Sequence, residues 1–276
     1  MTFLITGARG KVARAVTDRL HAAGHAVRTG SKDPAALTGP DATALDLADP
    51  ATFAAALDGV RRVFLYPEPS GIEDFLKAAD AAGVEHIVLL SSASVLAPGA
   101  ETDPLASHSL QVERALARSG IAHTFLRAGS FASNALGWAH FVSNGLPVQL
   151  AYPDAHLAVV HTDDIADIAA AVLTGDLSVD RPLTLTGPRS LTFREQLAVL
   201  GDVLGRDITV EQITRAEAER QMGRFMPAAM AGSLLDFWAA ASAGPEPIAD
   251  TTESLLGTPA RTFERWVREN AAAFTR

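Results

Sequence analysis

Cysteine is absent from the 276-residue sequence. This absence excludes a disulfide framework, a thiolate nucleophile and any zinc or iron–sulfur site held by cysteine. Tyrosine and lysine are scarce, with two and three residues, so chemistry that needs either side chain has few candidate positions. No apolar run reaches the roughly 18 residues that cross a bilayer, and we expect no membrane span.

Positive charge is also in short supply. Asp and Glu number 32 against 23 Lys and Arg, which gives a formal net charge of −9. Nucleic acids and anionic membranes would be repelled, and we expect neither as a partner. The first ten residues show no basic leader followed by an apolar stretch, so we expect a cytoplasmic chain. The 48% of hydrophobic residues can supply a full core for a monomer or a homodimer.

Short apolar runs alternate with longer segments of helical periodicity through much of the chain. This alternation predicts an α/β fold, a parallel sheet with helices on both faces. Gly24, Gly83 and Gly120 each follow a predicted helix, where a left-handed glycine is favoured. The predicted strands are Thr2 to Thr6, Ala26 to Thr29, Val63 to Tyr66, His86 to Ser91, His123 to Arg127 and Pro182 to Thr186. The predicted helices are Lys11 to Ala23, Ile72 to Ala82, Leu105 to Ser119 and Asp163 to Thr174.

The alternation weakens from about residue 131. We interpret 1–276 as a single domain with two lobes. The sheet core comprises 1–130 plus about 157–190, and a smaller, mostly helical, substrate-facing lobe comprises about 131–156 plus 191–276. Thr258 and Pro259 are typical of an N-cap followed by proline at the first helical position, which predicts a final helix over residues 260–274.

A glycine turn follows the first predicted strand and opens the first helix, in the run Thr6-Gly7-Ala8-Arg9-Gly10-Lys11-Val12-Ala13. Gly7 permits a tight turn, Gly10 lets backbone amides approach a pyrophosphate, and Ala13 keeps the helix close to the sheet. A pyrophosphate would then lie on the helix N-terminus. The position after a strand favours a dinucleotide site over the alternative, an ordinary strand-to-helix turn.

The end of the second strand distinguishes the two nicotinamide cofactors, because an acidic residue there binds a ribose hydroxyl and a cation accepts a 2′-phosphate. Ser31 and Lys32 stand at this end, and Arg28, Arg9 and Lys11 are further cations. We therefore predict NADP(H), with NAD left open by Asp33. Asp46 follows the third strand and is a candidate partner for the adenine amino group, or a loop-capping aspartate.

Several motifs in combination resemble the NmrA-like atypical short-chain dehydrogenases/reductases, and most closely those reductases related to quinone, azo-dye and ergot-alkaloid reductases. They are the glycine turn, Asp46 to Pro50, Val84 to Ser92, Ser119 to Asn134, Thr162 to Leu173 and Leu185 to Pro188. The resemblance implies a seven-stranded parallel Rossmann sheet, an NAD(P)(H) site at the strand C-termini and a variable C-terminal lobe for substrate. Arg127-Ala128 departs from the Arg-Pro pair common in the family. The residues expected around the cofactor are Thr6, Gly7, Arg9, Gly10, Lys11, Val12, Arg28, Ser31, Lys32, Asp46, Leu47, Tyr66, Pro67, Ser91, Gly129 and Phe131.

The usual proton relay of short-chain reductases is missing. It needs a Tyr with a Lys four residues later, but Ser70 follows Tyr66 at that spacing and His156 follows Tyr152. Ser92 matches the serine that orients substrate in related reductases, or it caps a turn. His108 is a candidate proton donor, or a surface residue near a helix start.

Hydride transfer to a conjugated acceptor does not require this relay, because the cofactor supplies the hydride and solvent can supply the proton. The acceptors that fit are quinones, enones and imines. The lobe is rich in aromatic and Met residues suited to a flat apolar substrate, although such stripes also form cores. The candidate substrate residues are Asn134, Trp138, Tyr152, Phe225 and Trp238.

Two histidines and two aspartates near residue 160 have a spacing that suggests a metal site. We interpret Thr162-Asp163-Asp164 instead as a helix N-cap with an acidic first turn, and we predict no metal. Glu113 is expected to pair with Arg114 or Arg118. The favoured function is an oxidoreductase, an NADP(H)-dependent reductase of a conjugated or aromatic small molecule. The alternatives are a non-catalytic NAD(P)-binding redox sensor of NmrA type, and an isomerase or cyclase.

Overall fold

The structure is a computed structural model that describes residues 1–37 and 41–275. It divides into two compact units, and each is described separately. Unit 1 comprises Met1–Thr102, Ala106–Ala128 and Thr162–Leu185, and unit 2 comprises Asp103–Leu105, Gly129–His161 and Thr186–Arg276. The boundaries between the two units lie near residues 128, 161 and 185, whereas the sequence predicted boundaries between the two lobes near 130, 156 and 190.

Unit 1 contains a seven-stranded sheet in the order β3-β2-β1-β4-β5-β6-β9, with every neighbouring pair parallel. This confirms the predicted Rossmann-like α/β fold. The strand order reverses between β1 and β4, and ligands of open α/β sheets bind at the carboxyl ends of the strands beside such a reversal. The strands are β1 (Thr2–Ile5), β2 (Ala26–Ser31), β3 (Ala42–Ala44), β4 (Val60–Leu65), β5 (His86–Ser92), β6 (Ala122–Ala128) and β9 (Leu183–Leu185).

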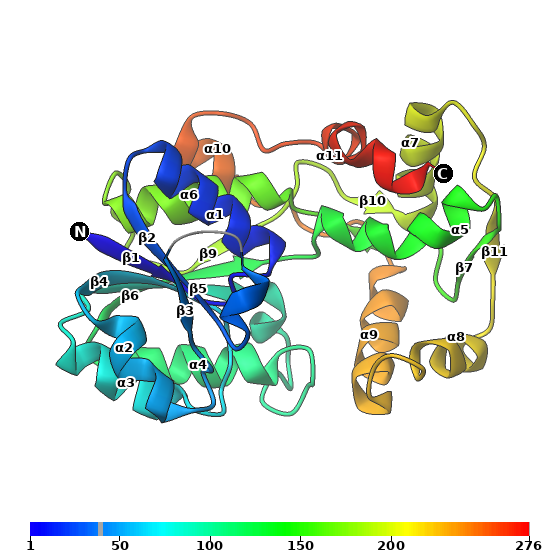
Figure 1. The fold of residues 1–276 in the computed structure, drawn as a ribbon. Helices are drawn as coiled ribbons and strands as arrows, with labels where there is room; N and C mark the ends of the chain where they lie inside the picture. Colours follow the sequence, from blue (N-terminus) through cyan, green and yellow to red (C-terminus); the bar gives the residue numbers. More distant parts are fainter. Residues whose placement is uncertain (38–40, 276) are drawn as a thin grey trace. The chain divides into compact units, whose positions relative to one another are not determined.

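Helices cover both faces of this sheet. Figure 1 shows α1 and α6 on one face and α2, α3 and α4 on the other. Their bounds are α1 (Lys11–Ala22), α2 (Phe53–Leu57), α3 (Ile72–Ala81), α4 (Ser107–Arg118) and α6 (Thr162–Thr174). Gly24, Gly83 and Gly120 adopt φ values of 79°, 76° and 76°, as predicted from their places after helices. The runs Val63–Leu65 of β4 and Ile87–Leu90 of β5 are apolar because helices cover both faces of the sheet.

Unit 2 is mostly helical, with two small two-stranded sheets. β7 (Val148–Leu150) pairs in parallel with β11 (Val210–Gln212), and β8 (His156–Leu157) pairs antiparallel with β10 (Leu191–Thr192). The helices are a 3-10 helix at Ala132–Trp138, α5 (Ala139–Ser143), α7 (Phe193–Leu204), α8 (Arg215–Met222), α9 (Ala228–Ala241), α10 (Thr251–Leu256), α11 (Phe263–Asn270) and a 3-10 helix at Ala271–Phe274.

The predicted start of the final helix was wrong. Thr262 is the N-cap of α11, because its side chain accepts a hydrogen bond from the backbone N–H of Arg265 at 3.2 Å. The apolar face that packs into the unit 2 core begins only at Phe263, so residues 258–262 have nothing to bury as a helix. Thr258 and Pro259 are exposed and follow Gly257, which ends α10 with a φ of 68°.

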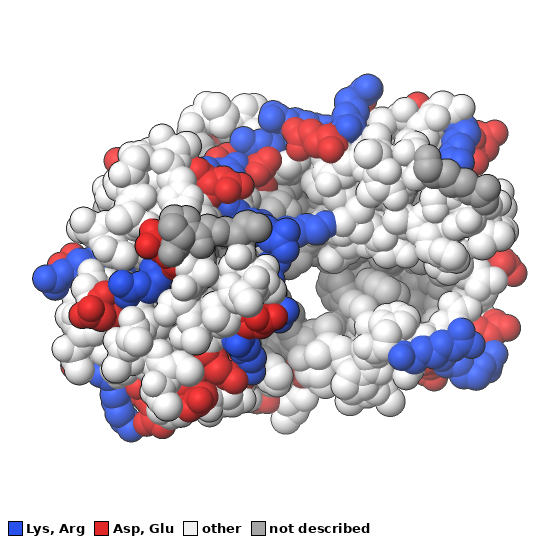
Figure 2. All heavy atoms as spheres, in the orientation of Figure 1, with Lys and Arg blue, Asp and Glu red and all other residues white. Residues whose placement is uncertain are grey.

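Charges of both signs are interspersed over the face of the molecule drawn in Figure 2. Many of them form ion pairs within one helix or between neighbouring elements, such as Arg265 with Glu269 and Arg118 with Glu73. Within residues 1–37 and 41–275, no helix is both long and apolar enough to cross a membrane.

Candidate functional site

The glycine turn lies at the carboxyl end of β1, and its backbone geometry requires glycine. Gly7 has a φ of 60°, and a Cβ atom there would lie 3.0 Å from the Cβ of Tyr66. The Gly10 N–H donates to the Gly7 carbonyl at 2.8 Å, which closes the turn. Thr6 is fully buried, and its hydroxyl accepts the Tyr66 N–H at 2.7 Å, so β1 and β4 are joined directly beneath the turn.

The N-terminus of α1 is free of competing side chains. Gly10 is the N-cap and offers no capping side chain, and the first turn carries no acidic residue. By contrast, α3 and α6 carry two acidic residues each in their first turns. The first N–H groups of α1 therefore remain open to an anion, and the helix dipole favours negative charge there.

A cavity of about 280 Å³ lies over this turn. Eight of the residues expected around the cofactor line this cavity: Thr6, Gly7, Arg9, Gly10, Ser31, Lys32, Leu47 and Tyr66. Four lining residues were missed by sequence reasoning: Ala8, Gly30, Leu45 and Glu68. Each of the four directly adjoins, in the sequence, a residue that was expected around the cofactor. Their proximity in sequence was the available signal.

Lys32 makes an ion pair with Asp46 at the rim of this cavity, with Nζ 2.9 Å from Oδ1. The hydrogen bond to Asp46 raises the pKa of Lys32, and the same bond lowers the pKa of Asp46, helped by the Ala48 N–H. Hydrogen bonds from Ser70 lower the pKa of Glu68. Arg9 is an exposed cation of the same cavity. The rim therefore holds both signs of charge, with Lys32 at the end of β2 and Arg9 in the glycine turn.

Arg28 does not line the cavity. Its guanidinium donates to the carbonyls of Ala56 and Asp58, each at 2.8 Å, and of Ala55 at 3.3 Å. These carbonyls belong to the end of α2, where the last turn has no intrahelical donors, so Arg28 satisfies a helix terminus. The sequence assignment of Arg28 to the cofactor is not supported by this placement.

Ser91 also turns away from the cavity. Its buried hydroxyl donates to Oε1 of Glu113 at 2.5 Å, and the same carboxylate accepts two hydrogen bonds from Arg127, at 3.0 and 2.7 Å. The expectation that Glu113 pairs with Arg114 or Arg118 was wrong, because those arginines bind Glu101 and Glu73. Glu113 faces the sheet on the buried side of α4, where only a strand residue can reach it.

The other expected cofactor residues take different positions. Lys11 and Val12 begin α1 outside the cavity lining, and burial together with the charge of Arg14 lowers the pKa of Lys11. Pro67 is half-buried beside Tyr66. Gly129 and Phe131 belong to unit 2, where Phe131 lines a second cavity.

The two candidate catalytic residues line neither of these cavities. Ser92 caps the short helix Ala93–Leu96, accepting from the Ser94 N–H at 3.2 Å and hydrogen-bonding the Ser94 hydroxyl at 2.7 Å. Of the two roles expected for Ser92, orienting substrate or capping a turn, the structure shows the cap. His108 is the exposed second residue of α4, and its charge is a minor contributor to the lowered pKa of Glu68.

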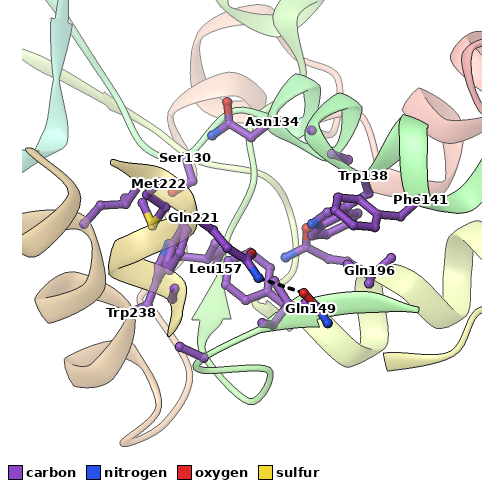
Figure 3. Close-up of a pocket in the computed structure, with 18 of the residues that line it drawn as sticks. Ser130, Asn134, Trp138, Phe141, Gln149, Leu157, Gln196, Gln221, Met222 and Trp238 are labelled. Carbon is purple, nitrogen blue, oxygen red and sulfur yellow. Dashed lines mark hydrogen bonds between the residues drawn. The ribbon is translucent and has the colours of Figure 1, made fainter. Parts of the chain in front are cut away.

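A second, larger cavity of about 810 Å³ lies within unit 2. Four of the five expected substrate residues line this cavity: Asn134, Trp138, Phe225 and Trp238. Tyr152 is outside the lining and packs in the cores beside it, with its hydroxyl hydrogen-bonded to Arg215. Among the described lining residues Arg224 alone carries a formal charge, and none is Asp, Glu, His, Lys or Tyr. Figure 3 shows aromatic rings and amide side chains around this space.

Comparison with known proteins agrees with the glycine turn and the sheet order. A family model described as NAD(P)H-binding matches residues 7–176. The chain belongs to the NAD(P)H-binding family. The match begins at the glycine turn and continues through α6, so it covers most of unit 1. The predicted family and its oxidoreductase class agree with the relatives described next.

Two curated relatives of this NAD(P)H-binding protein are enzymes. A Streptomyces griseus protein named (4-alkanoyl-5-oxo-2,5-dihydrofuran-3-yl)methyl phosphate reductase is 36% identical over 98% of both chains. An NAD(P)H azoreductase of Xenophilus azovorans is 32% identical over 86% of this chain and 84% of that one. Among solved structures, the Escherichia coli NADPH-dependent quinone oxidoreductase complexed with NADPH is 26% identical, covers 98% and 99% of the two chains, and has a TM-score of 0.81.

The residues of the smaller cavity fit an NAD(P)H cofactor. The turn has no Cβ at Gly7 or Gly10, and the uncapped N-terminus of α1 is the place for a pyrophosphate. The apolar side chains of Leu45 and Leu47 supply a wall beside the end of β2, where the adenosine end of a dinucleotide binds. The family and the cavity therefore agree.

Proposed function

We propose that the chain is an NADPH-dependent reductase of a conjugated or aromatic small molecule, such as a quinone, enone, imine or polycyclic metabolite. The observation that carries the proposal is the larger cavity. Its described walls combine aromatic and aliphatic side chains with neutral amides, and they contain no carboxylate, imidazole or phenol that could act as a general acid. A site of this kind suits an acceptor that needs no enzyme-bound proton donor.

The reaction balances without such a donor. A bound NADPH would supply the hydride and become NADP⁺, and the acceptor would take its one proton from water. In a quinone or an enone the added charge is delocalised onto oxygen, so protonation can follow from solvent. The work left to this chain is to bind the acceptor, to orient it and to exclude bulk water.

The choice of NADPH over NADH is supported by the rim of the smaller cavity. Lys32 directly follows Ser31 at the end of β2, where a 2′-phosphate would bind, and Arg9 of the glycine turn is a second cation that lines the same cavity. Asp46 holds the Lys32 ammonium at this edge. Arg28 is not counted among the cations near the 2′-phosphate, because its guanidinium caps the carbonyl end of α2.

The class of acceptor is supported by the relatives. The Streptomyces reductase is named for an oxo-dihydrofuran that carries an alkanoyl group, and the other two act on azo compounds and quinones by name. All of these are conjugated systems. The aromatic walls of the cavity, with Trp138, Phe193 and Trp238 in edge-to-face contact, suit planar ligands of this type.

The test is a screen of NADPH oxidation, followed by absorbance, against quinones, enones, imines and azo dyes. We expect turnover with at least one class, and Gly7→Val should abolish it, because a side chain at a φ of 60° and 3.0 Å from Tyr66 obstructs the turn. Micromolar NADPH binding with no turnover of any acceptor would contradict the reductase and leave the NAD(P)-binding sensor as the function.

A further inference from the structure

Gln196 is a polar side chain in an unusual place. It lies on α7, lines the larger cavity and is only 2% exposed. Its Nε2 donates to the carbonyl of Leu191 at 3.2 Å, and among the described residues its amide makes no other side-chain hydrogen bond. Figure 3 shows Gln196 reaching inward, with Trp138 and Phe141 on one side of the view and Met222 and Trp238 on the other.

A primary amide has two N–H donors and a carbonyl acceptor. Leu191 uses one donor, so one N–H and the carbonyl remain to be satisfied inside the cavity. Leaving such a group unpaired in an apolar environment is unfavourable, so a ligand that pairs with it gains affinity. The fold retains this amide on the face of α7 that also carries Phe193, Leu197 and Leu200, all of them buried apolar residues.

Of the other amides that line this cavity, Asn134 is exposed, and Gln149 and Gln221 hydrogen-bond side chains. Gln221 donates to Oε1 of Gln149 at 2.7 Å, and Gln149 donates to Oε2 of Glu211 at 2.7 Å. These residues are half-buried or exposed, so water also reaches them. Gln196 differs because it is almost entirely removed from solvent and retains hydrogen-bonding capacity.

Aromatic rings set the shape of the space beside Gln196. Phe193, three residues earlier on α7, lies between two tryptophans, with ring centroids 5.8 Å from Trp138 and 5.3 Å from Trp238. Both contacts are edge-to-face, at 84° and 88°. The flat faces of indole rings favour a planar ligand, and Gln196 then offers its free N–H to an acceptor at the edge of that ligand.

We propose that Gln196 determines substrate specificity by donating a hydrogen bond to a carbonyl oxygen of a neutral, planar substrate. The ligand class is a quinone or cyclic enone, rather than a hydrocarbon or a charged dye, because the cavity lining is mostly apolar and its described residues include a single charged one, Arg224. This inference rests on the proposed reductase function and names the group that the larger cavity recognises.

The experiment compares two ligands that share one ring skeleton, 1,4-naphthoquinone and naphthalene. Binding to each is followed by quenching of tryptophan fluorescence, since Trp138 and Trp238 line the cavity. Gln196→Leu should weaken naphthoquinone binding about threefold to tenfold, as expected for loss of one neutral hydrogen bond. It should leave naphthalene binding unchanged or tighter. Gln111→Leu, the same change on the exposed face of α4, is the matched control.

Gln196→Met preserves side-chain length and tests whether the effect depends on the amide rather than on folding. Both variants must show the same fall in naphthoquinone affinity relative to naphthalene. An equal fall for both ligands, or no fall for either, would overturn the inference. The proposed function is judged separately: if the wild-type protein binds naphthoquinone but never oxidises NADPH with it or with other acceptors, the reductase fails while the Gln196 result stands.

Discussion

Lys32 is held by a carboxylate that would itself favour the other cofactor. Asp46, 2.9 Å from the Lys32 ammonium, stands near the end of β3, and a free carboxylate in this region can accept a hydrogen bond from a ribose hydroxyl. We propose that Lys32 carries the preference for NADPH, because its ammonium lies where a 2′-phosphate would bind, and that Asp46 keeps the ammonium there.

Lys32→Ala should weaken NADPH binding about tenfold, because it removes a charge-assisted contact and frees Asp46. NADH binding should change by less than about twofold, and dissociation constants for both cofactors, measured by nicotinamide fluorescence, report the ratio. Asp46→Ala serves as the control and should leave NADPH binding nearly intact. Equal losses for NADPH and NADH in Lys32→Ala would refute this role.

At the scale of elements, a buried network ties α4 to the sheet. Ser91 of β5 and Arg127 of β6 are paired in the register of neighbouring strands, and both hydrogen-bond the carboxylate of Glu113. The Glu113 side chain is 4% exposed and the Arg127 side chain 19%. The carboxylate joins two strands and a helix. Its removal would therefore leave both the Ser91 hydroxyl and the Arg127 guanidinium without this hydrogen-bond acceptor.

Glu113→Ala should lower the free energy of unfolding by about 3 kcal/mol, since an unpaired charge remains in a mostly buried position. Urea unfolding followed by circular dichroism measures the loss. Replacing the whole network, with Glu113→Leu, Arg127→Met and Ser91→Ala combined, should restore most of it. A loss below about 1 kcal/mol in the single variant would show that water compensates Arg127.

Most elements of unit 1 were predictable because they carry their own signal, whereas the short β3 and α2 were absent from the predicted strands and helices. β4 and β5 each contain an apolar run, α1 and α3 have helical spacing, and Gly24 and Gly83 mark helix ends. The short strands β7, β8, β10 and β11 have two or three residues, so their pairing depends on contacts distant in sequence.

Among the site residues too, those with a local sequence signal were predictable and those that depend on distant contacts were not. The glycine turn was evident from spacing, but the partners of Arg28 and Glu113 were not, because long side chains reach elements that lie close only in the folded chain. Gln196 was also missed. Its signal was present, since a glutamine three residues after Phe193 and four before Leu200 falls on the apolar stripe of α7.

For the whole molecule, the last 18 residues are structural. Phe263, Trp266, Val267 and Phe274 are buried in the same core as α7 and the segments around β7 and β8. Burial of each such side chain contributes about 1.5–3 kcal/mol, and together they approach the total stability of about 5–15 kcal/mol of a typical protein. The C-terminal segment is thus as necessary to unit 2 as its central helices.

Removal of residues 259–276 should therefore abolish the cooperative unfolding of unit 2 and expose its apolar core. Near-ultraviolet circular dichroism should lose its tryptophan signal, and a hydrophobic dye should bind. Removal of residues 275–276 alone is the control and should change neither observable. An unaltered thermal transition in the shorter chain would contradict this assignment of stability.

Unit 2 is assembled from three stretches of sequence, 103–105, 129–161 and 186–276, with unit 1 segments between them. A single genetic crossover between two relatives near residue 128 would transfer the whole lining of the larger cavity, but it would also transfer α6 and β9, which lie between the second and third stretches. Such an exchange would therefore replace the helix that packs on α1 and the strand that pairs with β6. Substitutions within the cavity wall would change the cavity while the glycine turn and the sheet remain unchanged.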